Sequence, residues 1–262
     1  MRGHGRELPL YEGVLEASPA ELLRSWAGEP WLDDPRLGRV TGRRGFEAWV
    51  TSTREWLLGH DAEVRAVDLI RTPERTVEEV AIDLTIDGER RELPVAIAAD
   101  RTADGHFRAI RLYHSMWPLI GDHRIRAPML EGDPDLVGPD IVGEYQRALA
   151  AGDLEAVLAT YEDDAVVREP AGGPYVYSGR ESFRRIYTLQ FANGGGIPLE
   201  RCQITDDGRA CALEYNVVRW GASEMPRQAG LAVYVRGRTG KLAYGRIYDD
   251  AAPPAVSDSS AG

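Results

Sequence analysis

The sequence predicts an α+β fold that occurs twice, as two tandem cone-shaped domains, each with three helices packed on a curved antiparallel sheet. The first supporting observation is an internal repeat, because residues 11–115 can be laid over residues 145–250 with a period of about 134 residues. The second is that helical patterns come first in each copy and alternating strand patterns follow. A period of this length matches a domain, so we expect a tandem duplication and not a solenoid.

Each copy carries the same landmarks at nearly the same spacing. A tyrosine opens a helical segment, and an acid followed by proline comes 23 residues later in the first copy and 24 residues later in the second. A glycine then opens another helical pattern, and a titratable residue ends the last strand. The landmark residues are Tyr11, Asp34 and His114 in the first copy and Tyr145, Glu169 and Asp249 in the second.

The first copy continues from Tyr11 with helical patterns over residues 19–27 and 44–58. Alternating patterns then predict strands over residues 63–71, 76–86, 92–99 and 107–114.

The second copy shows helical spacing over residues 141–161, interrupted at Gly152-Asp153, where a glycine ends one helix and an aspartate caps the next. A third helix over residues 181–191 stops at three consecutive glycines. This triplet lacks the lysine of a phosphate-binding P-loop, so we interpret it as a helix-ending loop. Alternation then predicts strands over residues 199–205, 211–219, 230–235 and 242–249.

Composition shifts give the expected boundaries. The first domain is predicted over residues 8–120 as a divergent copy, and a linker rich in proline and glycine over 121–139. The second domain is predicted over 140–252, followed by a disordered tail over 253–262.

Composition also excludes several function classes. A net charge of -11 and a pI near 5.0 argue against nucleic acid and anionic membranes as partners. No run of about 18 apolar residues and no secretory signal pattern is present, so we expect a cytoplasmic protein. Histidine and cysteine spacings give no metal site, and the single lysine, Lys241, follows a turn, which disfavours Schiff-base chemistry. No cofactor is expected.

The second copy places titratable groups where the mouth of a cone would lie. Tyr145, Glu169 and Asp249 could converge there, beside an apolar wall formed by alternate strand residues. A carboxylate beside such a wall has a raised pKa, which suits a general base near neutral pH, and a phenol can donate to an oxyanion. The predicted pocket residues are Leu213, Tyr215, Val217, Ala232, Tyr234 and Ile247.

The residues of this copy resemble a known family. The stretches that carry the likeness are 144–154 (EYQRALAAGDL), 161–170 (YEDDAVVREP) and 178–179 (SG). They resemble the ketosteroid isomerase branch of the nuclear transport factor 2-like (NTF2-like) superfamily, which includes SnoaL-like polyketide cyclases and polyether epoxide hydrolases. The likeness covers the second copy and, more faintly, the first.

The resemblance implies roles for the landmark residues. Tyr145 matches the family's oxyanion-hole tyrosine and Glu169 its general base, while Tyr11 and Asp34 match them in the first copy. The family's second oxyanion donor falls near Ala232 and Ile97, both of which are apolar here. Losing one such donor removes roughly 3 kcal/mol of transition-state stabilisation.

Two functions therefore remain open. The first is cofactor-free proton transfer of isomerase, cyclase or epoxide hydrolase type on an apolar ketone, polyketide or epoxide, with Glu169 as base, Tyr145 as donor and Asp249 as auxiliary acid. In the first copy, Asp34 and His114 would form the corresponding pair. The second is a non-catalytic module for ligand binding or dimerisation. In either case we expect the copies to pack as an intrachain pseudo-dimer, with homo-oligomers also possible.

Overall fold

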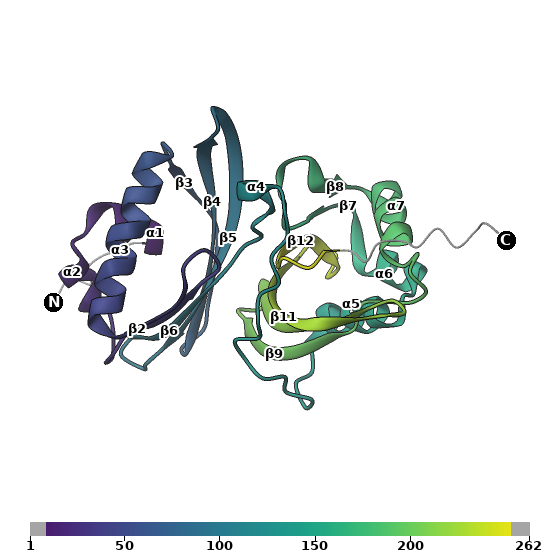
Figure 1. Cartoon of the computed structure of the whole chain (residues 1–262). Coiled ribbons are helices and arrows are strands. Elements are labelled where there is room, and N and C mark those ends of the chain that lie inside the picture. Colours follow the sequence, from purple (N-terminus) through teal and green to yellow (C-terminus); the bar gives the residue numbers. More distant parts are fainter. Residues whose placement is uncertain (1–8, 253–262) are drawn as a thin grey trace. The chain divides into compact units, whose positions relative to one another are not determined.

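The computed structural model describes residues 9–252 and divides the chain into two compact units, the first ending at His114 and the second beginning at Ser115 (Figure 1). The predicted tail and the charged lead-in before Pro9 lie outside the described residues. No helix within residues 9–252 combines the length and apolarity needed to cross a bilayer.

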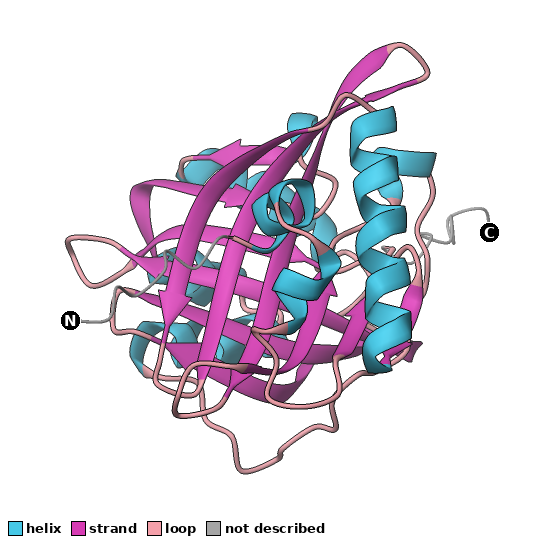
Figure 2. Cartoon of the chain, turned by 90° about the vertical axis from the view of Figure 1, so that its left-hand side faces the viewer, coloured by secondary structure: helices cyan, strands magenta, loops and turns pink. Residues whose placement is uncertain are grey.

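Over residues 9–114, the first unit consists of three helices and a six-stranded sheet with the order β2-β1-β6-β5-β4-β3. Its elements are α1 (Leu10–Glu16), α2 (Pro19–Leu23), β1 (Trp31–Asp34), β2 (Gly38–Thr41), α3 (Gly42–Gly59), β3 (Glu63–Arg71), β4 (Arg75–Ile86), β5 (Glu89–Arg101) and β6 (Phe107–Tyr113). Figure 2 shows the helices of this unit lying against one face of its strands.

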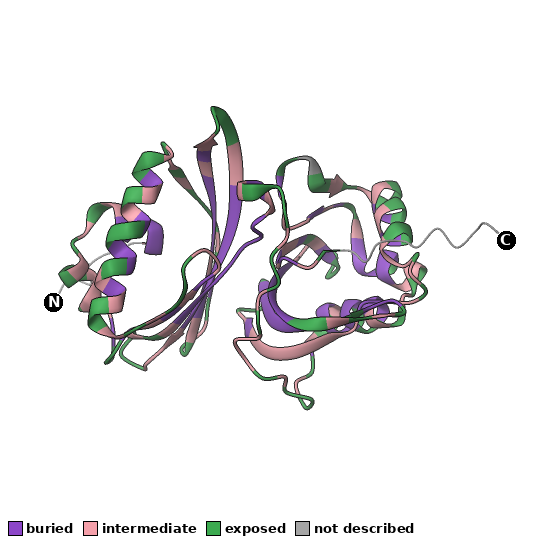
Figure 3. Ribbon diagram, viewed as in Figure 1, coloured by how far each residue is buried: buried purple, intermediate pink, exposed green. Residues whose placement is uncertain are grey.

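The amphipathic sequence of α3 explains how this helix covers the sheet. Phe46, Trp49, Val50 and Leu57 recur at helical spacing and are buried, while the opposite side of the helix is exposed (Figure 3). The Phe46 ring packs edge-on against Trp26, with 5.4 Å between the ring centroids. The hydrophobic face of α3 therefore closes the core of the first unit.

The second unit repeats this plan, with a six-stranded sheet in the order β8-β7-β12-β11-β10-β9. Its elements are α4 (Trp117–Ile120), α5 (Asp140–Ala151), α6 (Leu154–Thr160), β7 (Tyr161–Arg168), η1 (Gly173–Tyr175), β8 (Val176–Ser178), α7 (Arg180–Gln190), β9 (Leu199–Asp206), β10 (Ala210–Trp220), β11 (Ser223–Arg236) and β12 (Leu242–Tyr248).

The two sheets have the same strand order, position by position, which confirms the predicted α+β fold and its tandem duplication. Each sheet also contains one parallel pair, β1 with β6 and β7 with β12, so the sheets are mixed and not purely antiparallel as expected. The parallel partner in the second unit is β7, which is not among the strands expected from the sequence.

The junction between α5 and α6 follows from two residues. Gly152 adopts a left-handed conformation with φ of 69°, which ends α5, and the Asp153 side chain accepts a hydrogen bond from the backbone N–H of Ala156 at 3.0 Å. The predicted helix break is therefore confirmed.

The glycine triplet after α7 serves close backbone packing. A Cβ on Gly196 would lie 2.1 Å from the backbone oxygen of Leu149, at the end of α5. The next residue, Ile197, donates its backbone N–H to that same oxygen at 2.9 Å. The triplet thus ends one helix and docks against another, as a helix-ending loop does.

Part of the segment predicted as a linker packs on the second unit. The backbone N–H of Asp133 donates to the oxygen of Arg201 at 2.7 Å, and that of Ala229 donates to the oxygen of Arg126 at 2.8 Å. Residues 115–120, predicted with the first domain, also belong to the second compact unit. The boundaries at 8–120 and 140–252 remain predictions.

Candidate active site

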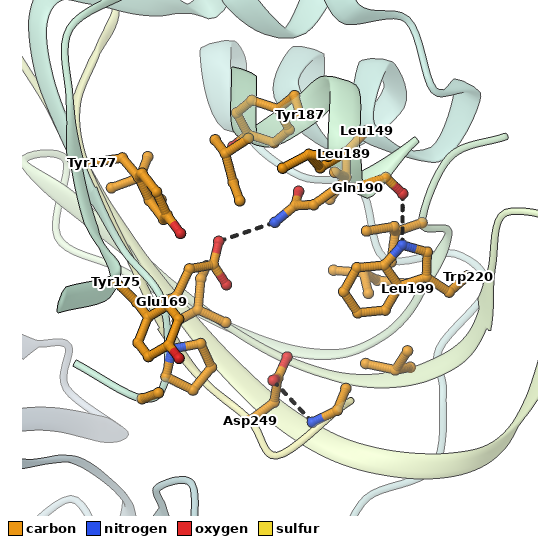
Figure 4. A pocket seen from close by; sticks show the side chains of 18 of the residues that line it. Leu149, Glu169, Tyr175, Tyr177, Tyr187, Leu189, Gln190, Leu199, Trp220 and Asp249 are labelled. Atoms are coloured by element: carbon orange, nitrogen blue, oxygen red, sulfur yellow. Dashed lines mark hydrogen bonds between the residues drawn. The ribbon is translucent and has the colours of Figure 1, made fainter. Parts of the chain in front are cut away.

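The second unit contains a cavity of about 440 Å³ between α5, α7 and the sheet (Figure 4). Apolar side chains from each of these elements line it, including Leu149, Ile186 and Val217. Cavities of this size accommodate small organic ligands, and an apolar lining with few polar groups is typical of such sites. The polar groups therefore decide what chemistry the cavity can support.

Most of the site residues predicted for the second copy meet in this cavity. Tyr145, Glu169 and Asp249 line it together with the wall residues Tyr215, Val217, Tyr234 and Ile247. The other two predicted wall residues, Leu213 and Ala232, are buried in the hydrophobic core cluster and lie outside the cavity lining.

Glu169 follows the last residue of β7 and projects into the cavity (Figure 4). Its carboxyl Oε1 accepts a hydrogen bond from the side-chain amide of Gln190 at 3.0 Å. Burial and, to a smaller extent, the negative charge of Asp249 raise the pKa of Glu169 from 4.5 to about 7, although the Gln190 hydrogen bond opposes the rise. This carboxyl group therefore holds a proton readily near neutral pH.

Asp249 follows the last residue of β12 and has more hydrogen-bond donors than Glu169. The Tyr215 hydroxyl donates to its Oδ2 at 2.7 Å, and the backbone N–H of Ala251 donates to its Oδ1 at 3.2 Å. Burial raises the pKa of Asp249 from 3.8 to about 6, while these two donors favour the ionised form and limit the rise. Asp249 is therefore the stronger acid of the two and the first to ionise.

A glycine makes the contact between Tyr215 and Asp249 possible. Gly230 on β11 lies directly opposite Tyr215 on β10. A Cβ at this position would lie 2.5 Å from the Tyr215 ring and 2.8 Å from the Cβ of Asp249. Only glycine leaves room for the tyrosine ring to cross β11 and reach the carboxylate.

Three tyrosine hydroxyl groups form a chain beside the cavity. The Tyr187 hydroxyl lies 3.0 Å from the hydroxyl of Tyr145 and 3.0 Å from that of Tyr161. Two hydrogen bonds use two of the three hydroxyl hydrogens, so one O–H remains available to donate to a ligand. Tyr145 and Tyr187 both line the cavity. Burial raises the pKa of Tyr145 to about 12, which keeps its hydroxyl group protonated as a donor.

The family model described as SnoaL-like domain matches residues 142–244, from α5 to β12. The second unit is a SnoaL-like domain. This agrees with the resemblance seen in the sequence. Because the first unit has a sheet of the same strand order, the chain is a tandem duplication of this fold.

Solved structures similar to the chain each span about one unit. A Sinorhizobium meliloti protein provisionally assigned as a polyketide cyclase has 22% identity and a TM-score of 0.36, covering 42% of this chain and 94% of its own. An NTF2-like protein of unknown function from Cytophaga hutchinsonii has 16% identity and a TM-score of 0.35, covering 45% and 95%. The epoxide hydrolase/cyclase-like enzyme SalBIII of salinomycin pyran-ring formation has 19% identity and a TM-score of 0.34, covering 42% and 87%.

Sequence reasoning missed several polar residues of the SnoaL-like domain. Tyr187 and Gln190 lie on one face of α7, and their spacing of three residues could have indicated this. The indole N–H of Trp220 donates to the backbone oxygen of Gln190 at 2.7 Å and holds the end of α7 in place (Figure 4). Trp117, at the start of the short helix α4, and His123, in the irregular segment after it, also line the cavity, but the sequence of this stretch has no periodicity.

The landmark residues of the first unit have different surroundings from those of the SnoaL-like domain. Asp34 accepts hydrogen bonds from the Trp49 indole at 2.8 Å and from the backbone N–H groups of Arg36 and Leu37 at 2.7 and 3.3 Å. These donors hold its carboxylate in place.

Tyr11 on α1 and His114 after β6 are both buried. A cavity of about 310 Å³ in this unit is lined by a different set of residues, among them Val67, Leu69 and Ile97. Within residues 9–252, no group of three or more His, Cys, Asp or Glu side chains could hold a metal ion.

Proposed function

We propose that the SnoaL-like domain of this chain catalyses cofactor-free proton transfer on an apolar ketone, polyketide or epoxide metabolite. Asp249 removes a proton from the bound molecule, while Glu169 and Tyr145 donate hydrogen bonds or a proton to its oxygen. One observation carries the proposal: two partly buried carboxyl groups with raised pKa values line one apolar cavity but differ in their hydrogen-bond donors.

The hydrogen bonds favour this division of roles over the one expected from the sequence. Asp249 receives two donors and is therefore stabilised as a carboxylate, the form that a base needs. Glu169 receives only the amide of Gln190 and has the higher pKa, so it is the better acid. Two carboxyl groups whose environments separate their pKa values can act as acid and base at one pH.

A protonated Glu169 would also supply a second oxyanion donor. When Glu169 is ionised, its negative charge raises the pKa of Tyr145, so the two groups are close enough to interact. Neutral Glu169 and the Tyr145 hydroxyl could therefore both donate hydrogen bonds to one substrate oxygen. This arrangement would replace the donor that the apolar Ala232 lacks.

The same groups fit two reaction types. For a ketone, Asp249 would take a proton from the carbon beside the carbonyl group while Glu169 and Tyr145 stabilise the enolate oxygen. For an epoxide, Asp249 would take the proton of an attacking hydroxyl group, the carbon–oxygen bond of the ring would break, and Glu169 would give its proton to the released oxygen. Neither reaction needs a redox partner.

A non-catalytic ligand-binding module is the alternative. An outward-facing Glu169 paired with a neighbouring arginine would favour it. Instead, Glu169 faces the cavity and hydrogen-bonds to Gln190, while the adjacent Arg168 lies over the Tyr248 ring at 4.6 Å. This geometry supports catalysis.

The first test is calorimetric binding of 2-naphthol, an enolate mimic, to the wild type and to Tyr145→Phe. We expect the variant to bind about tenfold more weakly, which corresponds to roughly 1.4 kcal/mol for a lost hydrogen bond. Tyr244→Phe is the matched control, because Tyr244 is exposed on β12 and should leave binding unchanged. Naphthol binding that is insensitive to Tyr145→Phe contradicts the assignment.

The second test measures proton transfer itself. The α-hydrogens of 2-tetralone, an apolar bicyclic ketone, should exchange with D₂O faster in the presence of the protein, as followed by NMR. Asp249→Asn should remove the acceleration, because general bases contribute about 10²–10⁴-fold. Naphthol binding without any acceleration of exchange would favour the ligand-binding module.

A further inference from the structure

A histidine from outside the family-matched region reaches the cavity. His123 lies in the segment that precedes α5, nineteen residues before the SnoaL-like match begins at residue 142, yet its side chain lines the cavity. Its imidazole ring packs on Trp117, which also lines the cavity, with 4.8 Å between the ring centroids. The ring is therefore held in place at the edge of the site, and about 25% of the side chain is exposed.

Asp250 fixes this segment against the end of β12. Its Oδ1 accepts from the Ser115 hydroxyl at 2.5 Å and lies 2.9 Å from Nδ1 of His123. Its Oδ2 accepts from the backbone N–H groups of Met116 at 3.0 Å and Arg124 at 2.8 Å. One carboxylate therefore organises both the backbone of the segment and the orientation of the imidazole.

These contacts determine which ring nitrogen carries the proton. A carboxylate that already accepts from three donors has only acceptor capacity, so Nδ1 of His123 must donate to it. In neutral imidazole the other nitrogen, Nε2, then has a free lone pair and can accept a proton. Within residues 9–252, no hydrogen bond engages Nε2.

The acid–base pair of the proposed function creates a need for such a group. After epoxide opening, Asp249 holds the proton it removed and Glu169 has lost the proton it gave. Both carboxyl groups then have the wrong protonation state for another turnover. Asp249 must release a proton from an apolar cavity toward solvent, and His123 lies at the partly exposed edge of that cavity.

We propose that His123 is the proton exit of the site, and that Asp250 is the positioning residue that holds its Nε2 ready to accept. The proton passes from Asp249 to Nε2 of His123, and the imidazolium then loses it to water. Glu169 takes back one proton from water, so that Asp249, His123 and Glu169 all return to their starting protonation states. Asp250 contacts Nδ1 of the ring directly and Asp249 interacts with the ring electrostatically, and both carboxylates stabilise the transient imidazolium. This inference rests on the proposed function.

Tautomer measurement tests the positioning role without any substrate. In ¹⁵N–¹H NMR of histidine-labelled protein, we expect His123 to carry its proton on Nδ1, with the signal assigned from its loss in His123→Gln. Asp250→Asn should abolish this preference. Asp122→Asn is the matched control, because Asp122 accepts only the backbone N–H of His123. Protonation on Nε2 in the wild type would overturn the positioning role.

Deuterium exchange of 2-tetralone tests the exit role. A hydrogen taken by Asp249 returns to the substrate unless it leaves to solvent, so His123→Ala should lower the exchange rate at least tenfold. Added imidazole should restore the rate, which a purely structural effect would not allow. His106→Ala, in the first unit, is the control. An unchanged rate, or a loss that imidazole does not rescue, overturns the proposal, whereas an absent wild-type rate refutes the proposed function instead.

Discussion

Replacing Glu169 by glutamine should make the protein more stable at alkaline pH and leave it unchanged in acid. The side chain of glutamine has the shape of glutamic acid and keeps an oxygen for the Gln190 amide, so packing and the hydrogen bond of 3.0 Å can persist. What the substitution removes is the ability to ionise inside the cavity. The free energy of unfolding therefore changes through one proton equilibrium.

The magnitude follows from the raised pKa of Glu169. Between its unfolded value of 4.5 and its folded value of about 7, the folded state binds more protons than the unfolded state. The contribution of Glu169 to the stability of the wild type is therefore fully present below pH 4.5. It is lost as the pH rises to 7, at about 1.4 kcal/mol per pH unit. The total loss is about 3 kcal/mol, and Glu169→Gln should not show it.

Urea unfolding followed by circular dichroism between pH 4 and pH 8 measures this difference. The stability gap between variant and wild type should grow from near zero to about 3 kcal/mol and level off above pH 7. Glu144→Gln makes the same chemical change on the exposed side of α5 and should give no pH-dependent gap. A constant gap for Glu169→Gln across this range would refute the reasoning.

Three further changes probe other parts of the chain. Gly230→Ala should push the Tyr215 ring away from its carboxylate partner and destabilise the protein by about 3 kcal/mol in urea unfolding, because the added Cβ would lie 2.5 Å from the ring. Asp34→Ala should cost about 2 kcal/mol, because the buried Trp49 indole loses its acceptor, while calorimetric 2-naphthol binding stays unchanged. The thiol of Cys211 should react at least about 100-fold more slowly than free cysteine with a chromogenic disulfide reagent, because burial raises its pKa to about 12.

Each of these three predictions has a result that would contradict it. Gly59→Ala is the control for steric effects, since a Cβ there meets nothing within 4 Å, and equal losses for both glycine variants would contradict the crowding argument. Weakened naphthol binding in Asp34→Ala would show that the first unit contributes to ligand binding. Fast labelling of Cys211 in the folded protein would mean that its strand opens.

The sequence predicted the fold well because the signals are local and repeated. The Gly152-Asp153 pair placed the α5–α6 junction correctly, since glycine and aspartate act there through their own backbone and side chain. Strand β7 was largely missed, because its burial does not alternate regularly and its three consecutive acidic residues, 162–164, give no strand pattern. Its place in the sheet depends on parallel pairing with β12, a long-range contact that no local pattern encodes.

The candidate site was predictable only where it coincides with the repeat. Tyr145 and Glu169 stand at the repeated spacing, and the structure places both in the cavity, although their roles remain proposals. Strand alternation correctly put Tyr215 on the inner face but could not tell how deep the cavity reaches, so Leu213 was included although it lies in the core. His123 depends on tertiary contacts of an irregular segment, which the sequence alone does not specify.

The contrast between Asp34 and Glu169 bears on how this protein would respond to selection for heat resistance. Asp34 is saturated with donors, so nearly every replacement there would be rejected by such a screen. The carboxyl group of Glu169 accepts one hydrogen bond, and its ionisation lowers the stability of the protein at neutral pH, so replacements there would be enriched. A thermostability screen would therefore keep Asp34 in the first repeat and replace Glu169 in the second. The most heat-resistant clones would then lack the acid on which the proposed catalysis in the cavity depends.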